Sequence, residues 1–168
     1  EYNKSISTYL SILFDKIICR NTSFGVWHKL QETVEHPFGR QAIPMVFDYP
    51  EMNPFSSLSG GCYGQLQSII DYIENEKSFA ANCNNIISGD KNQFEEKTIT
   101  CVVTDPPYYD AIAYADLSDF FYVWLKQTLG DVFPLVFSTP QTPKTEECTA
   151  LKHHHNNSLE EGKRHFEN

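Results

Sequence analysis

The sequence predicts an α/β fold that contains part of a parallel β-sheet, and three observations favour this class. Residues 99–103 form an apolar run without alternation, which is typical of a strand covered on both faces. The run leads directly into Thr104 to Tyr108, with the order Thr-Asp-Pro-Pro-Tyr. Proline cannot extend a sheet, so the strand must end at this point. Helical patterns precede and follow it, which gives the order typical of α/β proteins.

The first half of the chain is predicted to be helical and rich in loops. Residues 5–19 carry apolar side chains at helical spacing, so a helix with one apolar face is expected there. Residues 21–60 have no clean period and contain many prolines and glycines, so an irregular segment that folds against another region is expected. Residues 65–77 again have helical spacing, because Leu66, Ile69, Ile70 and Ile73 share a face.

The second half is predicted to alternate strands and helices. A short strand is expected at residues 84–88 and a longer one at 99–103, followed by a helix at 117–129 that ends at Gly130. After a polar connection, Ser158 is expected to cap a last helix. We therefore expect a helical and loop-rich region at 1–80 and a region carrying the Asp-Pro-Pro-Tyr motif at 81–168. Because the chain begins at Glu1, we expect it to be part of something longer.

Composition limits the classes of function. The chain has 168 residues, of which 40% are hydrophobic and 14% aromatic, so it can fold around a core. The net charge of −9 counts against a free-standing nucleic-acid-binding protein. The five cysteines include no Cys-x-x-Cys pair, which argues against a disulfide framework or a zinc ribbon. No membrane-spanning run or signal peptide is visible, so a cytoplasmic protein with reduced thiols is expected.

The Asp-Pro-Pro-Tyr motif has the groups needed to activate a planar amino group. An exocyclic amine is a poor nucleophile because its lone pair is delocalised into the ring. The Asp105 carboxylate and the Pro106 backbone carbonyl can accept hydrogen bonds from its two N–H groups, at about 1.5–3 kcal/mol for a bond to a charged partner. Pro107 stiffens the loop, and Tyr108 can stack on the base for about 1–3 kcal/mol. No metal is required, and a base in a duplex would have to be flipped out.

The motif resembles the catalytic motif of amino-methyltransferases that use S-adenosylmethionine. Aspartate in the first position favours adenine N6, whereas serine favours cytosine N4. The longer sequence 102–110, followed by 114–125, closely resembles a family of large prokaryotic adenine-specific DNA methylases with an amino-terminal domain of unknown function. Segments 38–45 and 53–56 are similar to a stretch upstream of the motif in that family. The resemblance covers most of this chain but only a middle part of the family's length.

The resemblance implies a partial Rossmann-like methyltransferase sheet with helical and loop-rich insertions. It implies a DNA adenine-N6 methyltransferase that uses S-adenosylmethionine, holds no metal and contacts DNA mainly through regions outside this chain. Asp90 and, with less support, Phe94 are expected to contact the cofactor. The family's glycine-rich cofactor loop is missing, and Gly60 to Gly64 is the nearest substitute. The resemblance implies the catalytic residues Asp105, Pro106, Pro107 and Tyr108, and we expect Tyr109 and Tyr114 to contact the substrate.

Alternative interpretations remain at this stage. The substrate could be RNA or cytosine N4, or the chain could be a non-catalytic module that binds nucleic acid or protein and retains the motif as a scaffold. The aromatic residues between 109 and 124 could stack on bases, but Phe121 and Trp124 are expected to belong to the core face of a helix. The three consecutive histidines 153–155 are expected to lie in an exposed loop, because consecutive residues do not share a helix face.

Overall fold

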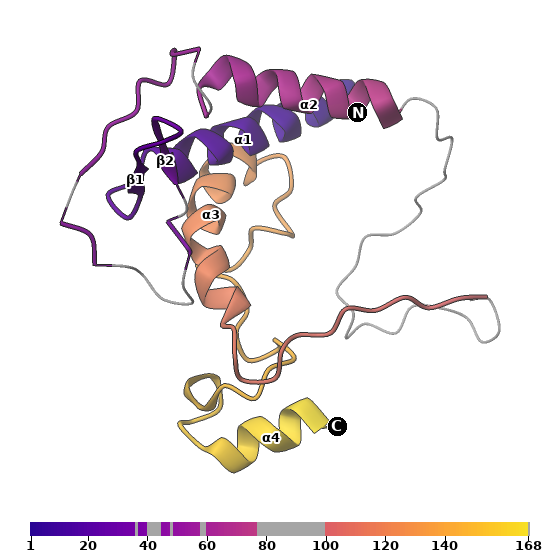
Figure 1. The fold of residues 1–168 in the computed structure, drawn as a ribbon. Helices are drawn as coiled ribbons and strands as arrows, with labels where there is room; N and C mark the ends of the chain where they lie inside the picture. Colours follow the sequence, from indigo (N-terminus) through magenta and orange to yellow (C-terminus); the bar gives the residue numbers. More distant parts are fainter. Residues whose placement is uncertain (36, 40–44, 48, 58–59, 77–99, 168) are drawn as a thin grey trace. The chain divides into compact units, whose positions relative to one another are not determined.

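The computed structural model describes residues 1–35, 37–39, 45–47, 49–57, 60–76 and 100–167. Two compact units each have their own packing: Glu1–Ser78 with Tyr114–Thr142, and Phe79–Ala113 with Pro143–Asn168. The elements, in chain order, are α1 (Tyr2–Arg20), β1 (Val26–His28), β2 (Thr33–Glu35), α2 (Cys62–Glu76), α3 (Tyr114–Leu129), the 3-10 helix η1 (Lys152–His154) and α4 (Leu159–Glu167) (Figure 1).

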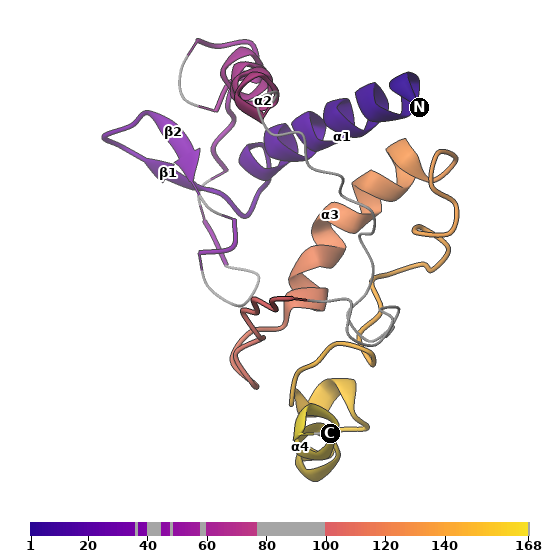
Figure 2. The same ribbon diagram turned by 90° about the vertical axis from the view of Figure 1, so that its right-hand side faces the viewer.

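Three helices form the core of the first unit. Helix α1 lies between α2 and α3 and packs against both (Figures 1 and 2). Each helix contributes a buried apolar residue, namely Leu13, Ile69 and Leu129. The ring of Phe14 meets that of Trp124 edge to face at 5.9 Å. The helices predicted at 5–19, 65–77 and 117–129 are therefore confirmed, and each begins a few residues earlier than expected.

A short antiparallel hairpin packs at the end of α1, within the region predicted to be irregular. Strands β1 and β2 pair Trp27 with Val34, and Val34 is fully buried. The Arg20 guanidinium donates hydrogen bonds through Nη1 to the Thr33 hydroxyl at 3.2 Å and the Val34 carbonyl at 3.0 Å. The prediction of irregular structure is wrong here, because three-residue strands are too short to produce a visible alternation in the sequence.

The segment after α3 folds back along that helix. Helix α3 ends at Leu129, and the Gly130 amide donates a hydrogen bond to the Lys126 carbonyl at 3.0 Å, which confirms the predicted stop. The Asp119 carboxylate accepts hydrogen bonds from the Thr142 amide at 2.9 Å and its hydroxyl at 2.6 Å. The buried Tyr122 hydroxyl bonds to the Thr139 carbonyl at 2.8 Å. Polar groups on α3 therefore fix residues 139–142.

The second unit contains α4, which packs against η1. The Ser158 hydroxyl accepts a hydrogen bond from the Glu161 amide at 3.2 Å, so the predicted cap of α4 is confirmed. The Ala150 amide donates to the Tyr109 carbonyl at 3.0 Å, and the ring of Phe166 meets that of Tyr109 at 4.8 Å. These contacts hold the chain that follows the Asp-Pro-Pro-Tyr motif against the carboxyl-terminal part of the unit.

The two predicted strands, unlike the predicted helices, are not confirmed. Residues 84–88 lie outside the described part of the chain. Residues 100–103 are in neither helix nor strand, and Val102 and Val103 are 75% and 92% exposed. The strand prediction is therefore wrong for these residues, because a strand forms only where a neighbouring segment pairs with it. The parallel sheet and the Rossmann-like fold remain predictions, since β1 and β2 form the only sheet within the described residues.

Helix α3 belongs to the first unit, although the sequence placed it in a region beginning at residue 81. The reason is that its apolar face packs against α1. None of the helices in the described part of the chain is both long and apolar enough to cross a membrane.

Replacing either of two glycines by alanine is expected to change stability, in opposite directions. A Cβ on Gly162 would lie 2.6 Å from the Ala150 carbonyl oxygen, so Gly162→Ala should push α4 away from residue 150 and destabilise its docking. A Cβ on Gly64, in α2, meets nothing within 4 Å, so Gly64→Ala should stabilise the chain by about 0.5–1 kcal/mol. Hydrogen exchange of the α4 amides and thermal unfolding measure the two effects. Unchanged protection of α4 in Gly162→Ala would contradict this assignment.

Candidate functional site

The Asp-Pro-Pro-Tyr motif lies in an exposed segment of the second unit. Asp105 and Pro106 are exposed, Pro107 is half-buried, and the Tyr108 side chain is 60% exposed. The two consecutive prolines restrict the backbone, because each fixes its own φ near −65° and limits the residue before it. The segment is therefore stiff without belonging to a helix or strand.

A tight turn follows the motif. The Tyr109 amide donates a hydrogen bond to the Pro107 carbonyl, and the Ala111 amide donates to the Tyr108 carbonyl, both at 2.9 Å. Tyr109 has φ of +54°, which is uncommon for a residue with a side chain and costs about 1 kcal/mol or more. Its contacts with Ala150 and Phe166 offset this strain. Tyr109 thus anchors the turn after the motif to Ala150 and Phe166, and its expected contact with the substrate stays a prediction.

The motif leaves two of its acceptors available. The carbonyls of Pro107 and Tyr108 are used in the turn. By contrast, neither the Asp105 carboxylate nor the Pro106 carbonyl accepts a hydrogen bond from the described residues. Both acceptors belong to adjacent residues, and the exposed ring of Tyr108 follows two positions later. These groups can accept N–H bonds from a planar amine and offer it an aromatic face.

The remaining predicted site residues are only partly described. Asp90 and Phe94 lie outside the described residues. Tyr114 begins α3 in the first unit and is 38% exposed, whereas Tyr109 belongs to the second unit. Phe121 and Trp124 are half-buried and pack against Phe38 and Phe14, so they face other parts of the unit as expected, although the buried residues of α3 are Ala115, Tyr122 and Leu129.

The glycine cluster considered as a cofactor loop does not fit that role. Gly60 has φ of +94°, and the space that a Cβ would fill is occupied by Arg20 Cδ at 2.5 Å and Met52 Sδ at 3.2 Å. Gly64 lies within α2. Protein side chains therefore pack against the turn, which leaves no cradle there for the methionine part of S-adenosylmethionine. The cofactor therefore remains a prediction that rests on the sequence resemblance and not on this turn.

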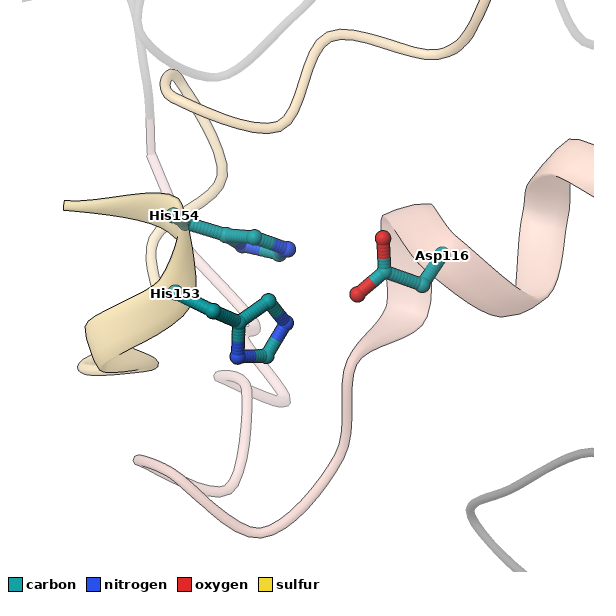
Figure 3. A group of neighbouring side chains, drawn as sticks. All are labelled: Asp116, His153 and His154. Carbon is teal, nitrogen blue, oxygen red and sulfur yellow. The ribbon is translucent and has the colours of Figure 1, made fainter. Parts of the chain in front are cut away.

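The three consecutive histidines are not simply an exposed loop. His153 and His154 lie on η1 with ring centroids 4.3 Å apart (Figure 3). His154 is 8% exposed, and its Nδ1 lies 3.4 Å from a Glu147 carboxylate oxygen. The exposed-loop prediction is therefore wrong for His154, because the 3-10 turn directs it inward. Asp116, also drawn in Figure 3, belongs to the first unit. Within the described part of the second unit, no group of three ligand-type side chains forms a metal site.

The sequence analysis missed a buried carboxylate on α1. Asp15 is 9% exposed, and its Oδ1 has no hydrogen-bond partner among the described residues. Burial raises the pKa of Asp15 from 3.8 to about 6, because the charged form loses its water. In the sequence it occurs between Phe14 and Lys16, within an apolar helical pattern. The apolar spacing of α1 places Asp15 away from the predicted apolar face, so the sequence held no signal of its burial.

Asp15 should make stability depend on pH. The folded state binds the Asp15 proton more tightly than the unfolded state does, because the pKa is raised on folding. The resulting stabilisation is fully present below pH 3.8 and is lost as the pH rises through about 6. Asp15→Asn should remove this dependence and raise the free energy of unfolding at pH 7.5 by about 1–2 kcal/mol. Urea unfolding across this pH range measures it.

The control for this experiment is Asp71→Asn, on the exposed face of α2. Asp71 accepts a hydrogen bond from Gln67 at 2.7 Å, and its replacement should change stability by less than about 0.5 kcal/mol. If the free energy of unfolding has the same pH dependence in both variants as in the unaltered chain, folding does not raise the pKa of Asp15.

Comparison of the chain with protein-family models, with curated proteins and with solved structures gives no match.

Proposed function

We propose that this chain carries the amine-binding loop of a cytoplasmic DNA adenine-N6 methyltransferase that uses S-adenosylmethionine. The observation that supports the proposal is that the motif has unused hydrogen-bond acceptors next to an exposed aromatic ring. The Asp105 carboxylate and Pro106 carbonyl have no hydrogen-bond partner among the described residues, and Tyr108 is exposed beside them. The resemblance of residues 102–125 to adenine-specific DNA methylases supplies the substrate and the cofactor.

The motif's own groups account for the chemistry at the amine. Two acceptors drawing on the two N–H groups favour a pyramidal nitrogen, whose lone pair is less delocalised into the ring and can point out of the ring plane toward a methyl donor. The Asp105 carboxylate also stabilises the positive charge that develops on the nitrogen, an effect that is strongest in the transition state. Tyr108 would stack on the base, and Pro106 and Pro107 limit the motion of the loop.

The substrate must be an extruded base. An amino group within a duplex is not accessible to a loop that must contact both of its N–H groups, so the adenine is flipped out. The net charge of the chain is −9, which disfavours close approach to phosphates. We therefore propose that DNA binding depends mainly on basic regions outside this chain.

The test is the transfer of a labelled methyl group from S-adenosylmethionine to unmethylated DNA, followed by mass spectrometry of the nucleosides. The assay uses the longest natural protein that carries this chain. N6-methyladenine is the expected product. N4-methylcytosine, or label in RNA, would move the assignment to the corresponding alternative substrate. The absence of any labelled nucleoside would overturn the proposal.

A second candidate is a non-catalytic interaction module. It is favoured by residues 100–103, which lie outside any strand with Val102 and Val103 exposed, since exposed apolar side chains suit a protein contact. Titration calorimetry with S-adenosylmethionine separates the two. Binding supports the enzyme, whereas no binding combined with capture of DNA or protein by residues 100–108 supports the module.

A further inference from the structure

One face of α1 lines an open pocket in the first unit, with a volume of about 450 Å³. Ile12, Asp15, Lys16 and Arg20 line it from α1, at spacings of three, four and eight residues that place them on one helix face. Gln65 from α2 and Phe121 from α3 complete the lining named here. The pocket belongs to a single unit, so its geometry does not depend on the Asp-Pro-Pro-Tyr loop.

The buried carboxylate is the first indication that this pocket takes a ligand. Asp15 lines the pocket, is nine-tenths buried and has an oxygen without a hydrogen-bond partner in the described part of the chain. Buried carboxylates are ordinarily paired with a cation or with N–H donors, because an unpaired one is unfavourable. Oδ1 itself is fully buried, so a ligand in the pocket would meet the other carboxylate oxygen, where an ammonium group would balance the buried negative charge.

Two cations at the same pocket restrict the choice of ligand. Lys16 is exposed, and Arg20 is held in place by its hydrogen bonds from Nη1 to Thr33 and Val34. The Nε and Nη2 groups of Arg20 make no hydrogen bond with the described residues. A ligand with only a positive charge would be repelled by these cations, and one with only a negative charge would face Asp15. A ligand carrying both charges satisfies all three side chains.

We propose that this pocket binds a small zwitterion with an apolar body, of the kind represented by an α-amino acid with an aromatic or branched side chain. Its ammonium bonds to Asp15, its carboxylate lies beside Lys16 and Arg20, and its side chain packs on Ile12 and Phe121. The proposal is independent of the methyltransferase proposal, because the two rest on different residues in different units.

The test compares three probes of the same size by calorimetric titration at pH 7.5. Phenylalanine has both charges, phenethylamine has only the positive one, and 3-phenylpropionate has only the negative one. Phenylalanine should bind at least about tenfold more tightly than either of the others. Asp15→Asn should weaken the binding of phenylalanine at least about tenfold, whereas the exposed control Asp71→Asn should leave it unchanged.

Further variation identifies each contact. Lys16→Gln, at an exposed position, should weaken binding of phenylalanine but not of phenethylamine. The affinity for phenylalanine should fall as the pH drops below about 6, because a proton on Asp15 competes with the ammonium. Among the described residues that line the pocket, the other ionisable groups are Lys16, Cys19 and Arg20, while α2 and α3 contribute the uncharged Gln65 and Phe121.

Three results would overturn the proposal. The first is that none of the probes binds at concentrations up to about 10 mM. The second is equal affinity for phenylalanine and phenethylamine, which would show that Lys16 and Arg20 do not bind the carboxylate. The third is unchanged binding in Asp15→Asn with helical content preserved by circular dichroism. Because the substitution is close to isosteric, retained helicity would show that the fold survives and that the carboxylate is not a ligand contact.

Discussion

Replacement of Asp105 by alanine is expected to lower the rate of methyl transfer to adenine by a factor of about 10²–10³. In the proposed function, the substitution removes the carboxylate that would accept an N–H bond and stabilise the developing positive charge. It should leave the fold intact, because Asp105 is exposed and makes no hydrogen bond with the described residues. Single-turnover methylation of DNA by the longest natural protein that contains the chain measures the effect.

The matched control for Asp105 is Asp110→Ala. Asp110 follows the two prolines and is exposed, as Asp105 is. Its replacement therefore tests whether the loss of any negative charge near the motif lowers activity. It should retain nearly full activity. Asp105→Asn keeps one acceptor oxygen and should fall between the two. Activity near the unaltered level in Asp105→Ala would remove the catalytic role of this loop and leave the interaction module as the remaining candidate.

Replacement of Leu13 by alanine is expected to lower the free energy of unfolding by about 2–4 kcal/mol. Leu13 is 7% exposed and lies on α1, the helix that packs against both α2 and α3. Truncation removes buried apolar atoms and leaves a cavity between elements far apart in sequence. Because small domains have a stability of only about 5–15 kcal/mol, the loss is large. Urea unfolding followed by tryptophan fluorescence detects it, since Trp27 and Trp124 lie in the same unit.

Leu10→Ala provides the comparison on the same helix. Leu10 is 55% exposed, so the same truncation should lower stability by less than about 1 kcal/mol. Both substitutions place alanine, the best helix former, in α1, and helix propensity therefore cancels between them. Equal losses in the two variants would contradict the difference in burial between Leu13 and Leu10.

The helices could be predicted from the sequence because their signals are local. The apolar spacing of residues 5–19 and 65–77 and the serine before α4 depend only on neighbours within a few positions. The chemistry proposed for Asp105 to Tyr108 also rests on a local signal, since four adjacent residues carry it, and it stays a prediction. Structure adds that the Pro107 carbonyl is used in a turn, which leaves Asp105 and Pro106 as the available acceptors.

The remaining features depend on partners distant in sequence, and no local pattern encodes those. Residues 100–103 have the composition of a strand, but composition does not supply a neighbour to pair with. The left-handed backbone of Tyr109 is held by Ala150 and Phe166, about 40 or more residues away. Asp15 is buried on α1, and the helices that pack against α1 follow much later in the chain.

The discontinuous make-up of the first unit has a consequence for synthesis on the ribosome. Helix α1 ends at Arg20, and its partner α3 begins at Tyr114. At about 5–20 residues per second, on the order of 5–20 s separate the synthesis of these two helices. During that interval the face of α1 that will contact α3 has no native partner, so it is exposed to aggregation or to chaperones. The closing of so long a loop also makes the pairing of α1 with α3 a slow step in folding.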